Sequence, residues 1–566
     1  MLKKKRFWFV LFLALIAFAV WRLRAGGLMV QKGSFLHVRL EGAYEEQPAD
    51  VFGRILGGPP TTLIDVLQSL HIAAVDERIA GVLLEVAPLA IGWAKAEDVR
   101  DAVARVKAEK KPVYAVIEQE AAAANLEYFV AVAADKVYVA PASTAPLNGL
   151  SAEYFFLGGV WEKLDVRMHV EKIAEYKTAG DMLVNRRMSA AHREMANSLL
   201  DSIDRRFVSA ITEGRGMSTE AVRELIDSAP VSPTEMASAG LADGVRYPSE
   251  VLDLDAGGAP VVKFDDYRRV DLDAVGKHPQ HSVAVVYGIG QIVQGTSGRT
   301  AFGAVMGSTT IVDAIDEAAA NSEAKAIVFR VDSPGGSALA SDLVWHATQR
   351  AREKKPVVVS MSDVAGSGGY YVAAGATRIL AQPTTLTGSI GVVFTRPDVT
   401  GLLDRFGITT ETLARGRYAR MNDVTAPFDD PTRAKIIAEI ESIYGVFVDR
   451  VATGRGLSVD QVKEIARGRV WTGAQAAENG LVDETGGFFA AVAAAKEAAG
   501  IPADQEVELI SYPRAKPFAE RVAEALAARI AGDMRLPGAG ALRTALSSVP
   551  LEGGVLALMA EAVEIR

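Results

Sequence analysis

The sequence predicts two tandem copies of one α/β domain, preceded by a transmembrane helix at the N-terminus. Three observations lead to this prediction. An internal repeat covers most of the chain, short apolar runs alternate with longer amphipathic ones inside each copy, and basic residues flank an apolar run within positions 1–26. A length of 566 residues allows three or four structural units, so each copy can hold a core of its own.

The internal repeat consists of four pairs of matching segments that occur in the same order in both halves. The pairs are TTLIDVLQSL (61–70) with TTIVDAIDEA (309–318), KAEKKPVYAVIEQE (107–120) with AREKKPVVVSMSDV (351–364), EGRGMSTEAVREL (213–225) with TGRGLSVDQVKEI (453–465), and AGLADGV (239–245) with NGLVDET (479–485). We therefore place the first copy at 34–250, a polar linker at 251–280, the second copy at 281–510 and a tail at 511–566.

Within each copy, the apolar pattern changes period from strand-like to helix-like and back. In the second copy SVAVVYG, AIVFRV, PVVVSMS and RILAQ are short runs rich in Val and Ile, typical of buried strands. The intervening IVDAIDEAAANS and ALASDLVWHATQRAREKK are amphipathic and predict helices. This alternation predicts a layered α/β fold with a largely parallel sheet in each copy.

The tail has a helical pattern, with apolar side chains on one stripe and charges opposite. Such a helix could dock on its own domain or pack between copies in an oligomer. The stripe comprises Phe518, Val522, Leu526 and Ile530.

The N-terminal segment bears on the compartment of the protein. Four basic residues precede fifteen apolar ones (7–21), and two arginines follow. A helix of that length spans roughly 22 Å, short of a ~30 Å hydrocarbon core, but Trp8, Trp21 and the arginines can extend it into the interfaces. An uncleaved anchor is favoured over a signal peptide cut after Ala19, because bulky Trp21 follows, and over a buried helix of a soluble protein. Either targeting interpretation places the residues after about position 25 outside the cytoplasm.

Composition excludes several classes of function. The net charge is −9, and because the first 24 residues hold six basic and no acidic side chains, the remainder carries −15. An acidic body of this kind argues against nucleic acid as a partner. The chain has no cysteine, which excludes disulfides and thiol catalysis.

Two glycine-rich turns distinguish the second copy from the first. DVAGSGGYYVAAGA (363–376) contains Ser367, and FRVDSPGGS (329–337) places Gly335 and Gly336 directly after a strand. The first copy has Asn125 in place of Ser367 and no glycines in LEVAPLAI (84–91). Glycines near one serine expose backbone N–H groups, as an oxyanion hole requires, although such turns also serve close packing alone.

A serine nucleophile needs a base, and none of the seven histidines lies in a glycine-rich or strand-end context. A lysine can serve if burial keeps its amine neutral. Lys177 in EYKTAG (175–180) lies in a small, partly apolar setting, and the second copy has Ala419 at the matching position. The first copy thus keeps a lysine and lacks the serine, and the second keeps the serine and lacks the lysine. Either the site combines both copies, or the two have decayed independently.

The motifs DSPGGS, GSGGYYVA and PTTLTGSIGV (383–392), in this order, resemble the signal peptide peptidase A family in its long, duplicated form. The resemblance covers nearly the whole chain after the N-terminal segment. It implies a Clp-protease/crotonase-like fold and a Ser–Lys catalytic dyad. Residue by residue, it implies Ser367 as nucleophile, Lys177 as general base, Ser389 as the serine that orients the lysine, and Gly368 with Gly335 or Gly336 as the oxyanion hole.

The same resemblance implies a membrane-anchored serine endopeptidase that degrades hydrophobic peptides, namely cleaved signal peptides, on the outer face of the cytoplasmic membrane. It also implies a homo-oligomer, a tetramer by analogy, with no metal or cofactor. Two other interpretations stay open: an enzyme of the crotonase branch acting on coenzyme A thioesters, which the N-terminal segment disfavours, and a non-catalytic membrane scaffold built on a decayed protease fold.

Overall fold

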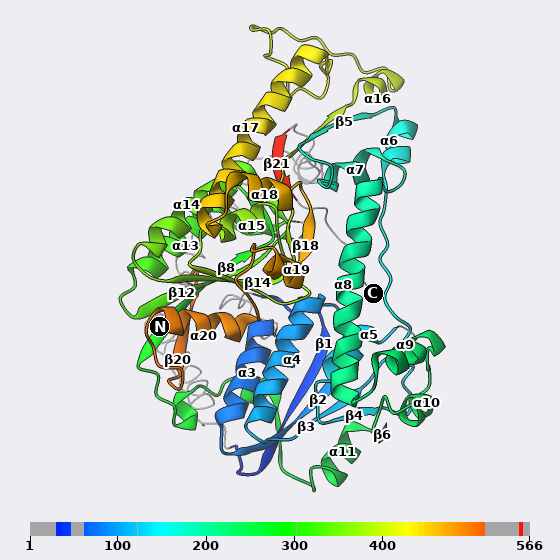
Figure 1. The fold of residues 1–566 in the computed structure, drawn as a ribbon, viewed down its shortest axis with the longest axis vertical. Helices are drawn as coiled ribbons and strands as arrows, with labels where there is room; N and C mark the ends of the chain where they lie inside the picture. Colours follow the sequence, from blue (N-terminus) through cyan, green and yellow to red (C-terminus); the bar gives the residue numbers. More distant parts are fainter. Residues whose placement is uncertain (1–29, 47–60, 121–122, 301–302, 515–553, 559–566) are drawn as a thin grey trace, which may run out of the picture.

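In the computed structural model, the described residues are 30–46, 61–120, 123–300, 303–514 and 554–558. Both copies have the predicted strand–helix alternation, and they stack on each other along the longest axis of the molecule (Figure 1). The predicted anchor at 1–26 and the helical stripe at 518–530 lie outside the described residues. Within the described part of the chain, no helix has the length and apolar character needed to cross a membrane.

The first copy is built on a six-stranded parallel sheet of order β6-β4-β3-β2-β1-β7. Its strands are β1 (Ser34–Gly42), β2 (Ile79–Leu89), β3 (Val113–Ile117), β4 (Lys136–Val139), β6 (Gly244–Val245) and β7 (Val261–Lys263). Its helices are α3 (Leu63–Val75), α4 (Trp93–Ala108), α5 (Asn125–Ala131), α6 (Gly158–Leu164), α7 (Ala179–Val184), α8 (Ala190–Arg215), α9 (Thr219–Ser228), α10 (Pro233–Ser238), α11 (Pro248–Leu254) and α12 (Phe264–Tyr267).

The second copy repeats this plan in an eight-stranded sheet whose main path is β18-β16-β14-β12-β8-β20, with β15 paired to β14 and β19 paired to β15. Its strands are β8 (His281–Ile289), β12 (Ala324–Ser333), β14 (Val357–Gly366), β15 (Arg378–Ala381), β16 (Leu386–Gly388), β18 (Val470–Thr472), β19 (Glu484–Thr485) and β20 (Val507–Tyr512). Its helices are α13 (Ser308–Ala320), α14 (Ala338–Arg352), α15 (Gly368–Ala373), α16 (Thr400–Arg405), α17 (Asp430–Arg455), α18 (Val459–Ile465), α19 (Gly473–Glu478) and α20 (Phe488–Ala498).

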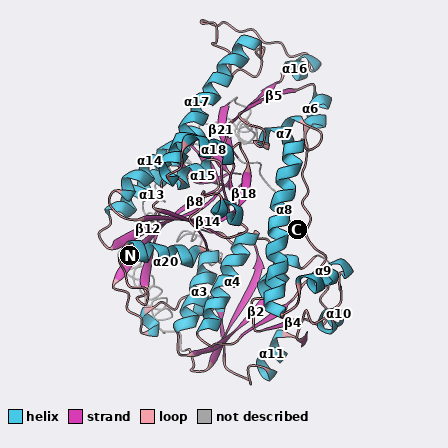
Figure 2. Ribbon diagram, in the orientation of Figure 1, coloured by secondary structure: helices cyan, strands magenta, loops and turns pink. Residues whose placement is uncertain are grey.

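A third, mixed sheet joins the two copies in the order β10-β11-β9-β13-β21-β17-β5. Only β5 comes from the first copy, and it pairs antiparallel with β17. The strands are β5 (Arg167–Lys172), β9 (Gln291–Val293), β10 (Gly298–Thr300), β11 (Gly303–Gly307), β13 (Gly335–Ser337), β17 (Val393–Asp398) and β21 (Gly554–Leu558). The sheets and the helices that cover them are shown in Figure 2.

Two segments differ from the expected boundaries. Part of the segment expected to be a linker forms β7, which pairs with β1 just as β20 pairs with β8. Tyr267 from the same segment is buried, and its hydroxyl donates to Asp76 (2.9 Å). Residues 554–558, within the segment expected to be helical, form strand β21. Sheet edges left unpaired by the repeat itself are thus covered by flanking chain.

One hydrophobic core cluster extends across both copies, and a second cluster lies within the second copy. The larger core cluster contains residues of β1–β4 together with Val283 and Val285 of β8 and Phe488 of α20. Helix α20 lies beside α3 and α4 at the boundary (Figure 1), and the Phe489 ring stacks on His71 of α3 at 4.6 Å. The copies are therefore packed as one unit.

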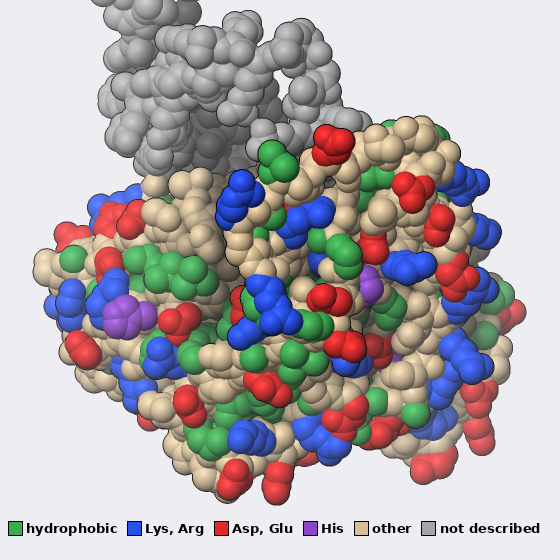
Figure 3. Space-filling view, turned by 90° about the horizontal axis from the view of Figure 1, so that it is seen from above, with side chains coloured by type: hydrophobic (Ala, Val, Ile, Leu, Met, Phe, Trp, Pro, Cys, Tyr) green, Lys and Arg blue, Asp and Glu red, His purple; other side chains and the backbone are tan. Residues whose placement is uncertain are grey.

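Basic and acidic side chains are interspersed over the described part of the surface seen from above (Figure 3).

Each copy has a long helix of 26 residues, α8 and α17, that ends at a glycine in the left-handed region. In both, a glycine in the last turn lies against the carbonyl of the shorter helix beside it. A Cβ built on Gly454 would lie 1.7 Å from the Ala374 oxygen, and one on Gly214 would lie 2.4 Å from the Val132 oxygen. The first glycine of the repeated "GRG" sequence thus allows the long helix to approach the shorter helix closely in both copies.

We expect Gly454→Ala to lower the free energy of unfolding by about 2 kcal/mol, because the new methyl group forces α17 away from α15. Gly445→Ala is the matched control: Gly445 lies in the same helix with nothing within 4 Å of its would-be Cβ. That change should stabilise by roughly 0.5–1 kcal/mol through helix propensity. Urea unfolding of both variants checks this, and equal effects would contradict the packing argument.

Candidate active site

Ser367 lies at the turn between β14 and α15, where the second sheet ends. Its backbone has φ 53° and ψ −111°, a conformation that is costly for a residue with a side chain. The turn is held from both sides: the N–H of Ser367 donates to the Gly388 carbonyl, and its own carbonyl accepts from the N–H of Tyr371, each at 2.8 Å. A strained serine that opens a helix in this way is held in one fixed orientation.

Lys177 comes from the first copy, in the segment between β5 and α7. Its Nζ lies 2.7 Å from Ser367 Oγ, 3.0 Å from Ser389 Oγ and 2.8 Å from the Ser389 carbonyl oxygen. The Lys177 side chain is 1% exposed, and Ser367 is fully buried. The structure thus brings the lysine of one copy to the serine of the other within a single chain.

Two glycines of the second copy make room for this lysine. A Cβ on Gly468 would lie 2.6 Å from Lys177 Cβ and from its backbone N, and one on Gly391 would lie 3.3 Å from Lys177 Cδ. Gly468 also has φ +73°, and its N–H donates to the Ile390 carbonyl (2.9 Å). The backbone of these two glycines therefore encloses the lysine, and a larger residue at either position would displace the Lys177 side chain.

Burial lowers the pKa of the Lys177 amine well below its usual range. In the described part of the chain, no carboxylate pairs with this amine, so the neutral form is favoured. A neutral amine has two N–H groups and one lone pair. The two oxygens of Ser389 can accept the N–H groups, and the lone pair then faces the Ser367 hydroxyl.

Ser389 follows β16 in the same way that Ser367 follows β14. The two strands are parallel neighbours, and Gly366 pairs with Gly388, so both serines leave the sheet at one edge. Ser389 also has a positive φ of 51°, and its N–H donates to the Arg469 carbonyl (2.7 Å). Parallel pairing therefore places two serines, 22 positions apart in sequence, around one amine.

The predicted oxyanion glycines lie together beside Ser367. A Cβ on Gly368 would lie 3.1 Å from both Gly335 Cα and Gly336 N, so the two glycine turns are in close backbone contact. Gly335 and Gly336 have φ values of +100° and +153°. The N–H of Gly335 donates to Ser333 Oγ at 3.1 Å, whereas no such side-chain acceptor is found for Gly368 among the described residues.

An extended segment of the chain's own C-terminus lies next to this glycine turn. Strand β21 pairs antiparallel with β13 on one side, with Gly336 opposite Ala557, and antiparallel with β17 on the other, with Phe394 opposite Val555. The slot between β13 and β17 thus accepts one strand of extended peptide through main-chain hydrogen bonds.

Sequence reasoning missed several residues around the site. Gly468 is not among the predicted site residues, although its neighbours in ARGRVWTG (466–473) indicate a turn. Asp332 and Asp363 stand inside the quoted motifs, and an acid within an apolar strand pattern is a signal of a buried partner. That partner is Lys95 of α4, which the sequence does not distinguish from a surface lysine.

Among the described residues, no group of three or more His, Asp or Glu side chains is arranged to hold a metal ion. The contacts around Lys177 and Ser367 involve only hydroxyl, amine and backbone groups. Such an arrangement can transfer a proton from a serine hydroxyl to an amine next to backbone N–H donors.

The model of peptidase family S49 matches this chain twice, over residues 105–258 and 349–502. The chain is 34% identical over 495 residues to the chloroplastic serine protease SPPA of Arabidopsis thaliana, covering 86% of this chain and 72% of the relative. It is 29% identical over 526 residues to protease 4 of Salmonella typhi, covering 87% and 83%. A putative signal peptide peptidase SppA of Enterococcus faecium is 39% identical over 168 residues, covering 29% and 47%.

Among solved structures, a ClpP1 variant from Listeria monocytogenes aligns with 37% of this chain and 94% of its own at 15% identity. The TM-score of 0.24 is too low for this likeness to bear on the fold. The two family matches fall on the two copies of the internal repeat.

Proposed function

The chain belongs to peptidase family S49, and from this premise we propose that it is a serine endopeptidase with Ser367 as nucleophile and Lys177 as general base. The observation that carries the proposal is the 2.7 Å contact between Lys177 Nζ and Ser367 Oγ at a buried amine of lowered pKa. Lys177 needs no third residue to remove its charge, because burial alone favours the neutral form.

The reaction follows from the geometry. Ser367 Oγ attacks the peptide carbonyl while its proton moves to the lone pair of Lys177 Nζ. The resulting oxyanion is held by the N–H of Gly368 and by backbone of the Gly335–Gly336 turn. The C–N bond then breaks, and the leaving amine takes the proton from Lys177. Water then attacks the acyl carbonyl while one of its protons moves to Lys177 Nζ. The bond from the acyl carbon to Ser367 Oγ breaks, Oγ takes the proton back from Lys177, and the acid leaves.

Ser389 is proposed to fix the orientation of the amine. Its carbonyl and hydroxyl oxygens occupy the two N–H groups, so the remaining lone pair points at Ser367. Ser389 does not touch the substrate carbonyl in this scheme and acts through Lys177.

We propose extended, hydrophobic peptides as substrates, with cleaved signal peptides as the natural class. The slot filled by β21 supports binding of an extended strand, because it offers main-chain partners on both sides. The assignment to signal peptides rests on the sequence motifs and on the name of the relative from Enterococcus faecium, a putative signal peptide peptidase. The proposal also includes an N-terminal membrane anchor, an extracytoplasmic site and a homo-oligomer, all from the sequence motifs.

The test is hydrolysis of a leucine-rich fluorogenic peptide by the full chain. Ser367→Ala and Lys177→Ala should each lower kcat by about 10⁴-fold or more, because each removes a partner of one unit. Ser202→Ala is the control, since it removes a buried hydroxyl whose hydrogen bond goes to Thr472 and not to Lys177, Ser367 or Ser389. An equimolar mixture of the two inactive variants should stay inactive, because both residues come from one chain. Full activity of Lys177→Ala would refute the base assignment, and inert wild type would favour a scaffold.

Activity should depend on pH through the Lys177 amine. Because its pKa is lowered, kcat/KM should rise with pH over a one-proton step centred well below the usual lysine value of ~10.4, and then stay level. Lys177→Arg should be inactive at every pH, since a guanidinium stays protonated. A rise centred near pH 10 would show that the amine is an ordinary solvated one.

Removal of the C-terminal strand should make the slot more accessible. If β21 occupies the slot in part of the full-length molecules, only the remaining fraction can bind added peptide. For a chain that ends at Arg514, KM should therefore fall by a factor equal to the reciprocal of that fraction, while kcat stays the same. A synthetic peptide GVLAL, added to the shortened chain, should compete with the substrate. An unchanged KM would mean that β21 does not compete with peptides at this site.

A further inference from the structure

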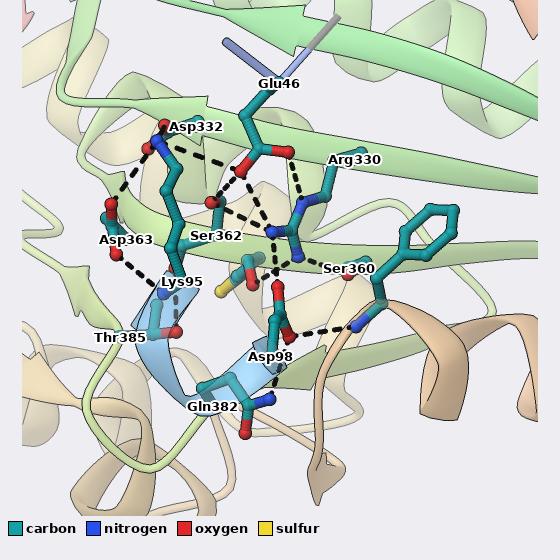
Figure 4. Close-up of polar contacts among 12 residues, drawn as sticks. Glu46, Lys95, Asp98, Arg330, Asp332, Ser360, Ser362, Asp363, Gln382 and Thr385 are labelled. Carbon is teal, nitrogen blue, oxygen red and sulfur yellow. Dashed lines mark hydrogen bonds and ion pairs between the residues drawn. The ribbon is translucent and has the colours of Figure 1, made fainter. Parts of the chain in front are cut away.

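A second lysine of the first copy, Lys95, also contacts the second copy. Its two aspartate partners lie on the strands that lead to the candidate site. Lys95 lies in the first turn of α4, and its Nζ contacts Asp332 Oδ2 at 2.8 Å, Asp363 Oδ2 at 3.3 Å and Glu46 Oε1 at 3.9 Å. Figure 4 shows the lysine between the two aspartates, with Glu46 beyond it. The Lys95 side chain is 12% exposed, so these pairs are little screened by solvent.

Asp363 connects the nucleophile strand to this helix. It stands on β14, four residues before Ser367, and its carboxylate accepts the N–H groups of Gly92 and Lys95, each at 3.0 Å. Gly92 offers no side-chain cap of its own, and a Cβ there would lie 2.3 Å from Asp363 Cγ. An aspartate of the second copy therefore caps helix α4 of the first.

Asp332 connects the glycine turn to the nucleophile strand. It stands on β12, directly before Ser333, whose hydroxyl accepts the N–H of Gly335. Asp332 Oδ1 accepts the N–H of Val364 at 3.2 Å, while Oδ2 contacts Lys95. One aspartate thus fixes the spacing between the segment that leads to Gly335–Gly336 and the segment that leads to Ser367.

Lys95 is the cation that pairs with both Asp332 and Asp363, because the neighbouring Arg330 pairs with other acids. Arg330, fully buried, is occupied by Glu46 and Asp98, with Nη2 to oxygen distances of 3.0 Å and 2.6 Å, and by the hydroxyls of Ser360 and Ser362 (Figure 4). Removing Lys95 would leave the carboxylates of Asp332 and Asp363, only 16% and 18% exposed, next to each other without a counter-ion. Such a pair separates or takes up protons, and either response moves the strands that carry it.

The acids are present only in the copy that keeps the serine. At the positions matching Asp332 and Asp363 the first copy has Ala87 and Gln119, and at the helix position matching Lys95 the second copy has Ala340. The lysine therefore comes from the first copy and its two aspartate partners from the second, the same division as for Lys177 and Ser367. A contact that served packing alone would not need to follow the catalytic division.

We propose that Lys95 is a positioning residue of the Ser367 site, which through Asp332 and Asp363 sets the distance between the nucleophile turn and the oxyanion glycines. The inference rests on the proposed function. Unlike the proposed function, it predicts a change in the backbone around Ser367 and Gly335–Gly336 that can be measured without substrate turnover.

The test is Lys95→Met in the full chain, which keeps the length of the side chain and removes its charge. We expect kcat to fall about 10- to 100-fold with KM within threefold, since a displacement of about 1 Å at a site has effects of this size. Labelling of Ser367 by a fluorophosphonate should slow in the same proportion. Amide hydrogen exchange at 332–337 and 362–368 should become faster, and Lys95→Arg should recover part of each effect.

The matched control is Lys111→Met. Lys111 is a lysine of the same copy that donates to the carbonyls of Ala73 and Asp76, both at 2.7 Å, and contacts neither aspartate. The Lys111→Met variant should be less stable than the wild type but have the same kcat. If Lys95→Met does not fold, Asp332→Asn replaces it with the same readouts, because it keeps the shape and removes one charge of the pair. A folded variant with wild-type kcat, labelling and exchange overturns the proposal. Inert, unlabelled wild type refutes the proposed function instead, and hydrogen exchange still tests the positioning.

Discussion

The buried amine of Lys177 is the constraint on which the rest of the site depends. A lysine without a carboxylate partner can be buried only as the neutral amine, because the cost of desolvating a lone ammonium is several kcal/mol. Its polar atom still needs partners, and the two oxygens of Ser389 and the hydroxyl of Ser367 supply them. The enclosure that favours the neutral amine is therefore also what directs it at the serine.

This enclosure requires both copies of the repeat. The lysine belongs to one copy, and the serines and the glycines that make room for its stem, Gly391 and Gly468, belong to the other. The shared core and the mixed sheet, in which β5 pairs with β17, hold the two copies in register. A duplicated chain can lose the serine from one copy and the lysine from the other and keep one complete site, because the missing half is always covalently attached.

Backbone strain at the site is offset by its surroundings. Ser367 and Ser389 both have positive φ, at corresponding ends of neighbouring parallel strands, and the N–H of each is bonded to a carbonyl of an adjacent segment. The buried ion pairs of Lys95 and Arg330 lie on the next segments, β12 and β14. Strain at two serines is thus opposed by charged contacts that tie these strands to α4, which holds the backbone rigid around the candidate site.

The sequence by itself determined the duplication and the α/β alternation, because repeats and periodicity are visible in the residue pattern. The glycine-rich motifs and the comparison of the two copies made Ser367 and Lys177 candidates, and the family resemblance added Ser389. Only the tertiary structure decided which atoms meet: the 2.7 Å contact across 190 positions, the room provided by Gly468, and the pairing of Lys95 with Asp332 and Asp363. It also showed that 261–263 and 554–558 are strands, since edge pairing depends on which neighbour is free. A lysine has the same local sequence signature whether it is solvated or buried, and its pKa is set by what the rest of the chain packs around it.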